Sequence, residues 1–160
     1  MCKGYISMRL LLSSIAFRNG GIINKKYTCD GENISPSLSW DYESKDVKSF
    51  AVLCEDQNAH DKLITHWILF NIPGDIRILL TGLSDMEIFS KGIKEGINSF
   101  GKIGYDGPCP PKKEEHRYFF RIYALDTFLD LKSGIDREQF LNTIQGHILT
   151  EGELMGVYKG

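Results

Sequence analysis

The sequence lacks the patterns that mark most metal, nucleotide and hydrolase sites. Its four cysteines show no Cys-x-x-Cys spacing, which argues against a zinc site or a thioredoxin-like motif. It contains no His-Glu-x-x-His or His-x-His, no Gly-x-Ser-x-Gly nucleophile elbow, and no Walker A or Gly-x-Gly-x-x-Gly loop. We therefore expect neither a bound metal ion nor an organic cofactor.

Long apolar runs and an excess of charge of one sign are also missing. No run approaches the ~20 residues that span a bilayer. The formal net charge is −2 and the basic residues are scattered, so we expect no nucleic-acid surface and no stable membrane insertion. The apolar stretch near Met8 is short, is interrupted by Ser13-Ser14, and precedes no small-x-small cleavage site. It predicts a first strand in a cytoplasmic protein, while Met1 and Met8 both remain candidate starts.

The cysteines are Cys2, Cys29, Cys54 and Cys109. Without an export signal they are expected to be reduced thiols. Cys54 lies inside an apolar run and is expected in the core. A Cys29–Cys109 disulfide, or one through Cys2, remains the open alternative.

Strand patterns dominate a chain of 160 residues, which is most simply one domain spanning residues 1–160. Ser49–Cys54, Thr65–Ile72 and Tyr118–Leu125 are rich in apolar, β-branched or aromatic residues, and the third is expected to be the last long strand. Ile34–Trp40 carries Pro36, which favours an edge or irregular strand.

One helix is predicted near the C-terminus. Asp136 can cap it, and Gln139 completes a capping box. Phe140, Leu141, Ile144 and Ile148 then share one face. A second helical segment is expected over Ile148–Met155. Strands followed by a helix indicate an all-β core with a C-terminal helix packed on it.

Three of the five prolines crowd into one loop, Gly107-Pro108-Cys109-Pro110-Pro111. Prolines fix the backbone and remove amide donors, while glycine allows close approach. Two interpretations remain open from the residue types: the wall of a pre-shaped pocket, or an ordinary proline-rich surface turn.

Polar residues stand at the ends of two strong strands. Glu55-Asp56 closes one strand and His66 opens the next, so antiparallel pairing would bring Asp56 and His66 to one rim, where His116 could join them. An acid beside a histidine raises its pKa and fixes its tautomer. A cationic histidine pair would then hold an anion such as phosphate. The alternative is three unrelated surface residues.

A nucleophile is harder to place. A Cys109–His116 pair is conceivable. However, Cys109 lies between prolines, and the simplest role for its side chain is to fill a pocket wall.

Several long motifs resemble those of the phosphatidylethanolamine-binding protein (Raf kinase inhibitor protein) family, specifically its bacterial and archaeal branch. The match runs from about Leu10 to Tyr158. The matching segments are Tyr27–Pro36, Leu38–Trp40, Thr65–Trp67, Asn71–Pro73, Gly101–Pro111, His116–Asp126 and Gly146-His147 in the expected terminal helix.

The resemblance implies a β-sandwich of two antiparallel sheets with a small anion pocket at one end. The ligand-binding residues that it implies are Asp56, Asn58, His60, His66, Tyr105, Gly107, Cys109, Pro110, His116 and Tyr118. The family reads D-P-D-A-P where this chain has Asp56-Gln57-Asn58-Ala59-His60. Both prolines and the second acid are absent, so the pocket is expected to be less acidic, with His60 as an added cation at its mouth.

Two function classes follow from the resemblance. The first is a non-catalytic binding protein that holds a phosphate-like anion and modulates a partner such as a kinase or a protease, with a homodimer as the expected assembly. The second is a small-molecule hydrolase that uses Cys109 or the Asp56, His66 and His116 cluster. The absence of a positioned nucleophile or metal-ligand set in the sequence favours the first.

Overall fold

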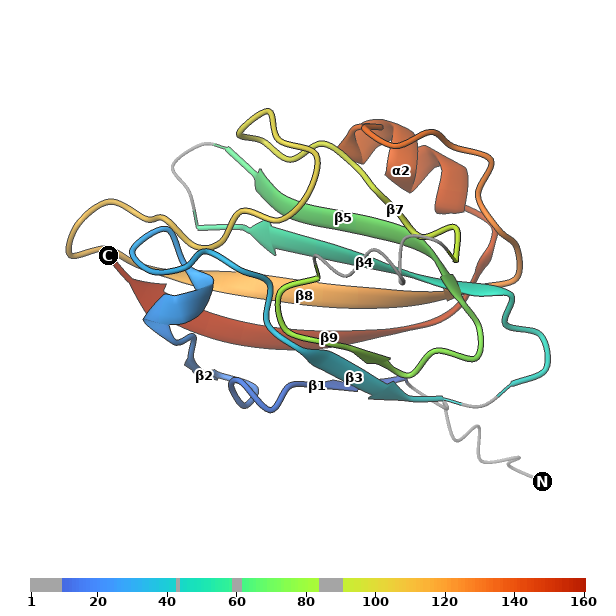
Figure 1. Cartoon of the computed structure of the whole chain (residues 1–160), viewed down its shortest axis with the longest axis horizontal. Helices are drawn as coiled ribbons and strands as arrows, with labels where there is room; N and C mark the ends of the chain where they lie inside the picture. Colours follow the sequence, from blue (N-terminus) through green and yellow to red (C-terminus); the bar gives the residue numbers. More distant parts are fainter. Residues whose placement is uncertain (1–9, 43, 59–61, 84–90) are drawn as a thin grey trace, which may run out of the picture.

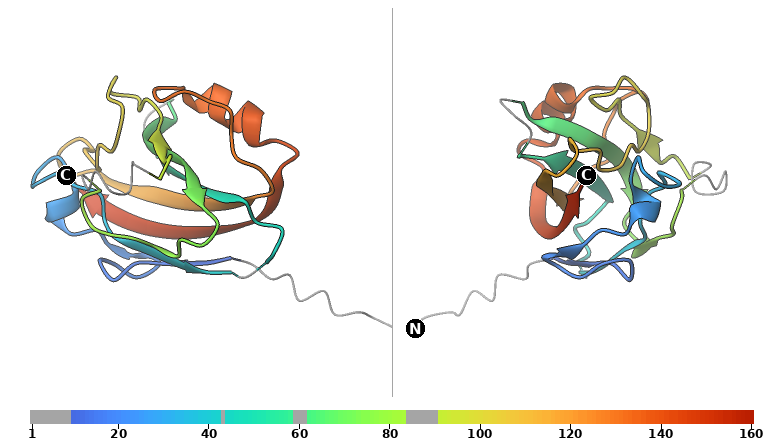
Figure 2. Two further views of the ribbon diagram at one scale, coloured as in Figure 1. Left: turned by 45° about the vertical axis from the view of Figure 1, so that its right-hand side comes forward. Right: turned by 90° about the vertical axis from the view of Figure 1, so that its left-hand side faces the viewer.

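Two β-sheets packed face to face make up most of the computed structural model, which describes residues 10–42, 44–58, 62–83 and 91–160 (Figures 1 and 2). The elements in chain order are β1 (Leu11–Ser13), β2 (Gly21–Ile22), the 3-10 helix η1 (Lys25–Tyr27), β3 (Leu38–Asp41), β4 (Ser49–Asp56), β5 (Ile64–Pro73), β6 (Ile78–Leu79), β7 (Lys94–Glu95), β8 (Glu115–Leu125), α2 (Arg137–Ile144) and β9 (Ile148–Lys159). The all-β sandwich expected from the sequence is confirmed.

The larger sheet has the strand order β2-β9-β8-β4-β5-β7, and the smaller has β1-β3-β6. Pairing is antiparallel except between the short β2 and β9, which are parallel. The predicted pairing of the two strong strands is confirmed, with Asp56 of β4 opposite Ile64 of β5. β3 lies between β1 and β6, so it is not an edge strand. Of the two possibilities that Pro36 favoured, an edge or an irregular strand, the second fits, because residues 34–37 are irregular and the strand begins only after the proline.

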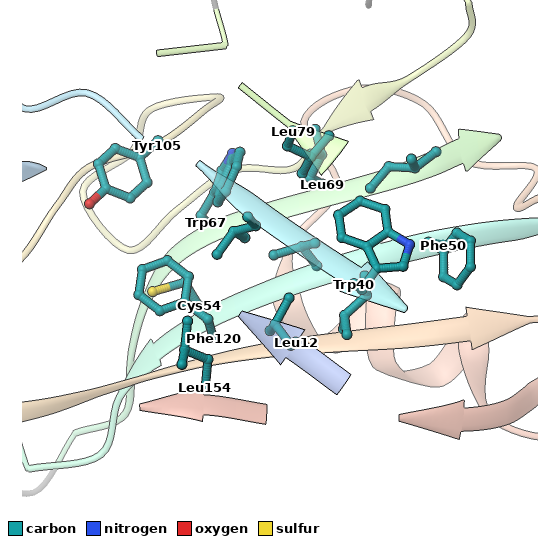
Figure 3. Close-up of a cluster of buried hydrophobic side chains, with 14 of the residues drawn as sticks. Leu12, Trp40, Phe50, Cys54, Trp67, Leu69, Leu79, Tyr105, Phe120 and Leu154 are labelled. Carbon is teal, nitrogen blue, oxygen red and sulfur yellow. The ribbon is translucent and has the colours of Figure 1, made fainter. Parts of the chain in front are cut away.

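The main core fills the space between the sheets. Every residue of β4 is buried, as are the inner residues of β5, because β4 is covered on both faces and flanked by β5 and β8. Trp40 and Leu12 of the small sheet face Phe50, Leu69 and Phe120 of the large one (Figure 3). Cys54 is fully buried here, as predicted.

Helix α2 covers the outer face of the large sheet (Figure 1). The predicted capping box is present: the Asp136 carboxylate accepts from Gln139 N, and the Gln139 side chain accepts from Asp136 N. Phe140 and Ile144 are buried against β4 and β5. Within the described part of the chain, no helix is long and apolar enough to cross a membrane.

The chain after α2 corrects three expectations. Ile148–Lys159 is the twelve-residue strand β9, not a helical segment, so Tyr118–Leu125 is not the last long strand. Gly146 and His147 lie in the turn between α2 and β9 rather than in a terminal helix, with Gly146 at φ +85°. Ile148 is exposed and belongs to β9. β9 pairs with β8 along almost its whole length.

A buried carboxylate ties α2 to the sheet. Glu55 of β4 is 1% exposed and accepts a hydrogen bond from Arg121 of β8 at 3.0 Å and another from Arg137 of α2. Arg121 also meets the half-exposed Glu153 of β9 at 3.1 Å. A buried charge is tolerated because two cations compensate it.

We predict that Glu55→Ala lowers the free energy of unfolding by roughly 2 kcal/mol, less than the ~3–5 kcal/mol for breaking a fully buried pair, since both arginine heads can reach solvent. Glu153→Ala is the matched control, because it removes an exposed partner of the same Arg121 and should change stability by less than about 0.5 kcal/mol. Urea unfolding of both variants tests this. Equal losses of unfolding free energy in the two variants would show that the burial of Glu55 does not strengthen its contribution to stability.

Candidate functional site

A cavity of about 260 Å³ opens at one end of the sandwich. At that end β4 finishes and β5 and β8 begin (Figure 1). The loop between β7 and β8 forms its other side. Its described wall consists of Asp56, Lys62, Ile64, His66, Phe100, Cys109, Pro110, Pro111 and His116. The antiparallel register places these strand ends together, since Asp56 lies opposite Ile64 on β5 and opposite Tyr118 on β8.

Asp56 and His116 form a buried pair. His116 Nδ1 lies 2.6 Å from Asp56 Oδ2, and both side chains are at most 5% exposed. The other carboxylate oxygen accepts from Asn58 N at 2.8 Å. The sequence predicted that Asp56 and His66 would meet at one rim, where His116 could join them. All three line the same cavity, and the hydrogen bond to Asp56 is made by His116 of β8.

His66 is oriented by the main chain rather than by an acid. Its Nδ1 lies 2.7 Å from the carbonyl oxygen of Asp106, and Asp106 N donates to the carbonyl oxygen of His66 at 3.1 Å. Burial lowers the pKa of His66, against opposing contributions from the Asp106 carbonyl and the Asp56 charge. The Asp56 charge does raise this pKa, as expected, but burial outweighs it and the net shift is downward.

The site holds two polar atoms without a close partner. His66 Nε2 is buried and has no hydrogen-bond partner among the described residues. The ring of Tyr118 stands edge-on to His66, with ring centroids 5.3 Å apart, and its Oη makes no close hydrogen bond among the described residues. Burial is the main cause that raises the pKa of Tyr118, and the Asp56 carboxylate adds to it. Buried polar groups usually have partners, so the unpartnered His66 Nε2 beside the cavity points to a ligand.

The proline-rich loop is fastened to the η1 region. Gly107 N donates to Asn33 Oδ1 at 2.7 Å, and Cys29 N donates to the Pro108 carbonyl at 3.1 Å. Cys29 and Cys109 form a disulfide. The expectation of reduced thiols is wrong for this pair. The two loops lie side by side at one end of the sandwich, with the cysteine Cα atoms 5.4 Å apart. The spacing of the cysteines in the sequence does not reveal that the loops are neighbours.

The structure brings together five of the ten predicted site residues in the cavity wall. These are Asp56, His66, Cys109, Pro110 and His116. Tyr118 lies behind His66, and Gly107 lies in the adjoining loop, where its backbone contacts Asn33.

Two predicted residues lie elsewhere, and a third is outside the described part of the chain. Asn58 Oδ1 accepts from the Arg117 backbone at 2.9 Å, so its side chain braces β8 rather than lining the cavity. Tyr105 Oη donates to the Tyr27 carbonyl at 2.6 Å, and its ring stands edge-on to Trp67 in the core. His60 lies outside the described residues.

Sequence reasoning missed three wall residues, Lys62, Ile64 and Phe100, and the carbonyl of Asp106. Ile64 could have been found from the alternation of the strand that it begins. Phe100 could not, because its place beside His66, with ring centroids 5.4 Å apart, depends on the path of a long loop.

The arrangement offers binding groups but no activated nucleophile in the described residues. Cys109 is disulfide-bonded and so has no thiolate. Cys54 is fully buried, and burial raises the pKa of its thiol. No group of three or more His, Cys, Asp or Glu side chains in the described ranges is arranged to hold a metal ion.

Sequence comparison finds one family match over nearly the whole chain. The family model described as phosphatidylethanolamine-binding protein matches residues 13–159. A UPF0098 protein from Methanothermobacter thermautotrophicus is 48% identical over 148 residues, covering 92% of this chain and 97% of the relative. A UPF0098 protein from Chlamydia muridarum is 42% identical over 153 residues, and the match covers 92% of this chain and 97% of that relative.

Solved structures give the same result. The crystal structure of CT736, a phosphatidylethanolamine-binding protein homologue from Chlamydia trachomatis, matches with a TM-score of 0.85 and 37% identity over 96% of this chain and 99% of its own. Escherichia coli YbcL, described as a member of the mammalian family of that name, matches with a TM-score of 0.86 and 27% identity over 95% of this chain and 99% of its own.

Proposed function

This chain belongs to the phosphatidylethanolamine-binding protein family, and from that premise we propose that its cavity is a binding site for a phosphate-bearing or similar oxyanionic group and does no catalysis. The proposed site residues are Asp56, His66, Cys109, Pro110 and His116, with Lys62 as an added cation at the wall. Modulation of a kinase or a protease, and a homodimer, are further hypotheses that rest on family membership alone.

The observation that carries the proposal is the buried, unpartnered Nε2 of His66 beside the cavity. An unpaired buried polar group costs about 1–3 kcal/mol, which a fold keeps where a ligand completes the hydrogen bond. His116 supports the same interpretation, because its ring is held by Asp56 and lines the same cavity. Binding rather than turnover is favoured because the described wall offers oriented imidazoles but no free thiol.

We predict that phosphate and phosphoethanolamine produce saturable amide shifts at Asp56, at Ile64–His66 and at Gly107–Tyr118, and that His66→Ala weakens binding at least about tenfold through loss of a buried hydrogen-bonding group. An amide NMR titration measures both. His147→Ala is the control, since His147 Nδ1 also has a hydrogen-bond partner, Asp126 Oδ1 at 2.7 Å, but the ring is exposed on the turn before β9. Absence of shifts at millimolar ligand, or equal weakening by both variants, would refute the proposed site.

A further inference from the structure

We propose that His66 accepts a hydrogen bond from the ligand, so that the cavity selects tetrahedral oxyanions that still carry a proton over fully deprotonated ones of the same shape. The favoured class is hydrogen phosphate and the singly protonated forms of phosphate monoesters; the disfavoured one is exemplified by sulfate. This inference rests on the proposed function of the same cavity.

The geometry at Nδ1 determines what Nε2 can do. A backbone carbonyl only accepts hydrogen bonds, so the nitrogen that lies 2.7 Å from the Asp106 oxygen carries the hydrogen. A neutral imidazole has a single N–H. Nε2 is then left with its lone pair, buried, and with no donor offered by the described residues. The missing partner is therefore a donor on the ligand.

The surroundings of His66 favour the neutral ring. Burial is the largest influence on its pKa and lowers it; the Asp56 and Asp106 carboxylates and the carbonyls of Asp106 and Gly107 oppose this without reversing it. The rings of Phe100 and Tyr118 lie 5.4 and 5.3 Å away and exclude solvent from its two sides. The remaining charged or titratable groups of the cavity wall are Lys62 and His116.

The two histidines of the wall have different surroundings. His116 Nδ1 faces the carboxylate of Asp56, and its Nε2 lies 4.0 Å from Glu114 Oε1. His66 Nδ1 faces an uncharged carbonyl instead. A ligand oxygen that reaches His66 Nε2 must therefore carry a proton. Sulfate has no proton to offer and would place an oxygen against the His66 lone pair, so we expect it to bind at least about tenfold more weakly than phosphate.

The first test needs no ligand. Long-range proton–nitrogen correlation spectra of the imidazole groups should show His66 as the neutral ring with hydrogen on Nδ1 and none on Nε2 from about pH 6 to pH 8. His66→Gln identifies the signals by their loss. A protonated Nε2 in the free protein would overturn the inference and leave the proposed function standing.

The second test compares phosphate, methyl phosphate and sulfate by NMR titration at about pH 5 and about pH 8. Phosphate retains a proton at both and should bind at both. Methyl phosphate loses its last proton near pH 6, so its affinity should fall at the higher pH. Sulfate should bind at least about tenfold more weakly throughout. In His66→Gln the preference should shrink to about twofold, because a carboxamide can turn to donate or accept.

The outcomes separate this inference from the function beneath it. Equal affinity of the wild-type protein for sulfate and phosphate would overturn the selectivity and keep the anion site. No binding of any of the three ions would overturn both. A preference for phosphate that persists unchanged in His66→Gln would assign the discrimination to another group and so refute the role of His66.

Discussion

Gly107→Ala is expected to lower the free energy of unfolding by about 3 kcal/mol or more and to abolish phosphate binding. Overpacking of a rigid site typically costs about 1–3 kcal/mol. The cost is at the upper end here because the neighbouring atom belongs to the backbone, which cannot rotate away as a side chain can. A Cβ atom on Gly107 would lie 1.9 Å from the Tyr27 carbonyl oxygen and 2.9 Å from Tyr105 Oη. Those two atoms are themselves joined by a 2.6 Å hydrogen bond. The added methyl group must separate the proline-rich loop from the η1 region, and with it the cavity wall.

Gly101→Ala provides the matched control for this prediction. Gly101 lies in the same connection, at φ +82°, and an added Cβ there would have no neighbouring atom within 4 Å, so only backbone strain of about 1 kcal/mol is expected. Urea unfolding followed by phosphate titration of both variants measures the difference. If Gly107→Ala were no less stable than Gly101→Ala, the tight contact between the two loops would be disproved.

The parts of the fold that sequence reasoning predicted correctly are those whose cause is local. The capping box of α2 follows from two residues three positions apart. The strands around Cys54 and Trp67 follow from continuous apolar and β-branched runs.

The strand β9 was missed because its glycines have a long-range cause. Gly152 and Gly156 lie within β9, and each marks a close approach of another segment. A Cβ on Gly152 would meet the Leu10 carbonyl at 2.2 Å, and one on Gly156 would meet the Ile23 side chain at 2.5 Å. Neither neighbour can be inferred from the residues around β9.

The site shows the same division. The positions of the strand ends predicted Asp56, His66 and His116 at one rim, and all three line the cavity. Strand order alone does not decide which histidine meets Asp56, because β4 lies between β5 and β8; in the structure His116 of β8 makes the hydrogen bond. The group that orients His66 is a main-chain carbonyl. Every residue except proline has the same backbone groups, so no residue type in the sequence could identify it.

Removing the Cys29–Cys109 disulfide is expected to lower the free energy of unfolding by about 3–4 kcal/mol. The bond joins two residues with a sequence separation of 80. A disulfide that closes so long a loop strongly restricts the unfolded chain. Phosphate binding should weaken but persist. Cys109 and Pro110 line the cavity, whereas the hydrogen bonds from Gly107 to Asn33 and from Cys29 to Pro108 still fasten the loop.

The experiment compares urea unfolding of the wild-type protein with and without a dithiol reductant, alongside the Cys29→Ser, Cys109→Ser double variant. Both cysteines are exposed, so a reductant should reach the bond in the folded protein. Reduced wild-type and the double variant should unfold at the same lower urea concentration, and the reductant should leave the double variant unchanged, because the buried Cys54 takes no part. A wild-type midpoint that does not move, with reduction verified by mass, would mean that packing and hydrogen bonds alone hold the two loops together. Loss of stability without weaker phosphate binding would instead separate the role of the disulfide in folding from any role in shaping the cavity.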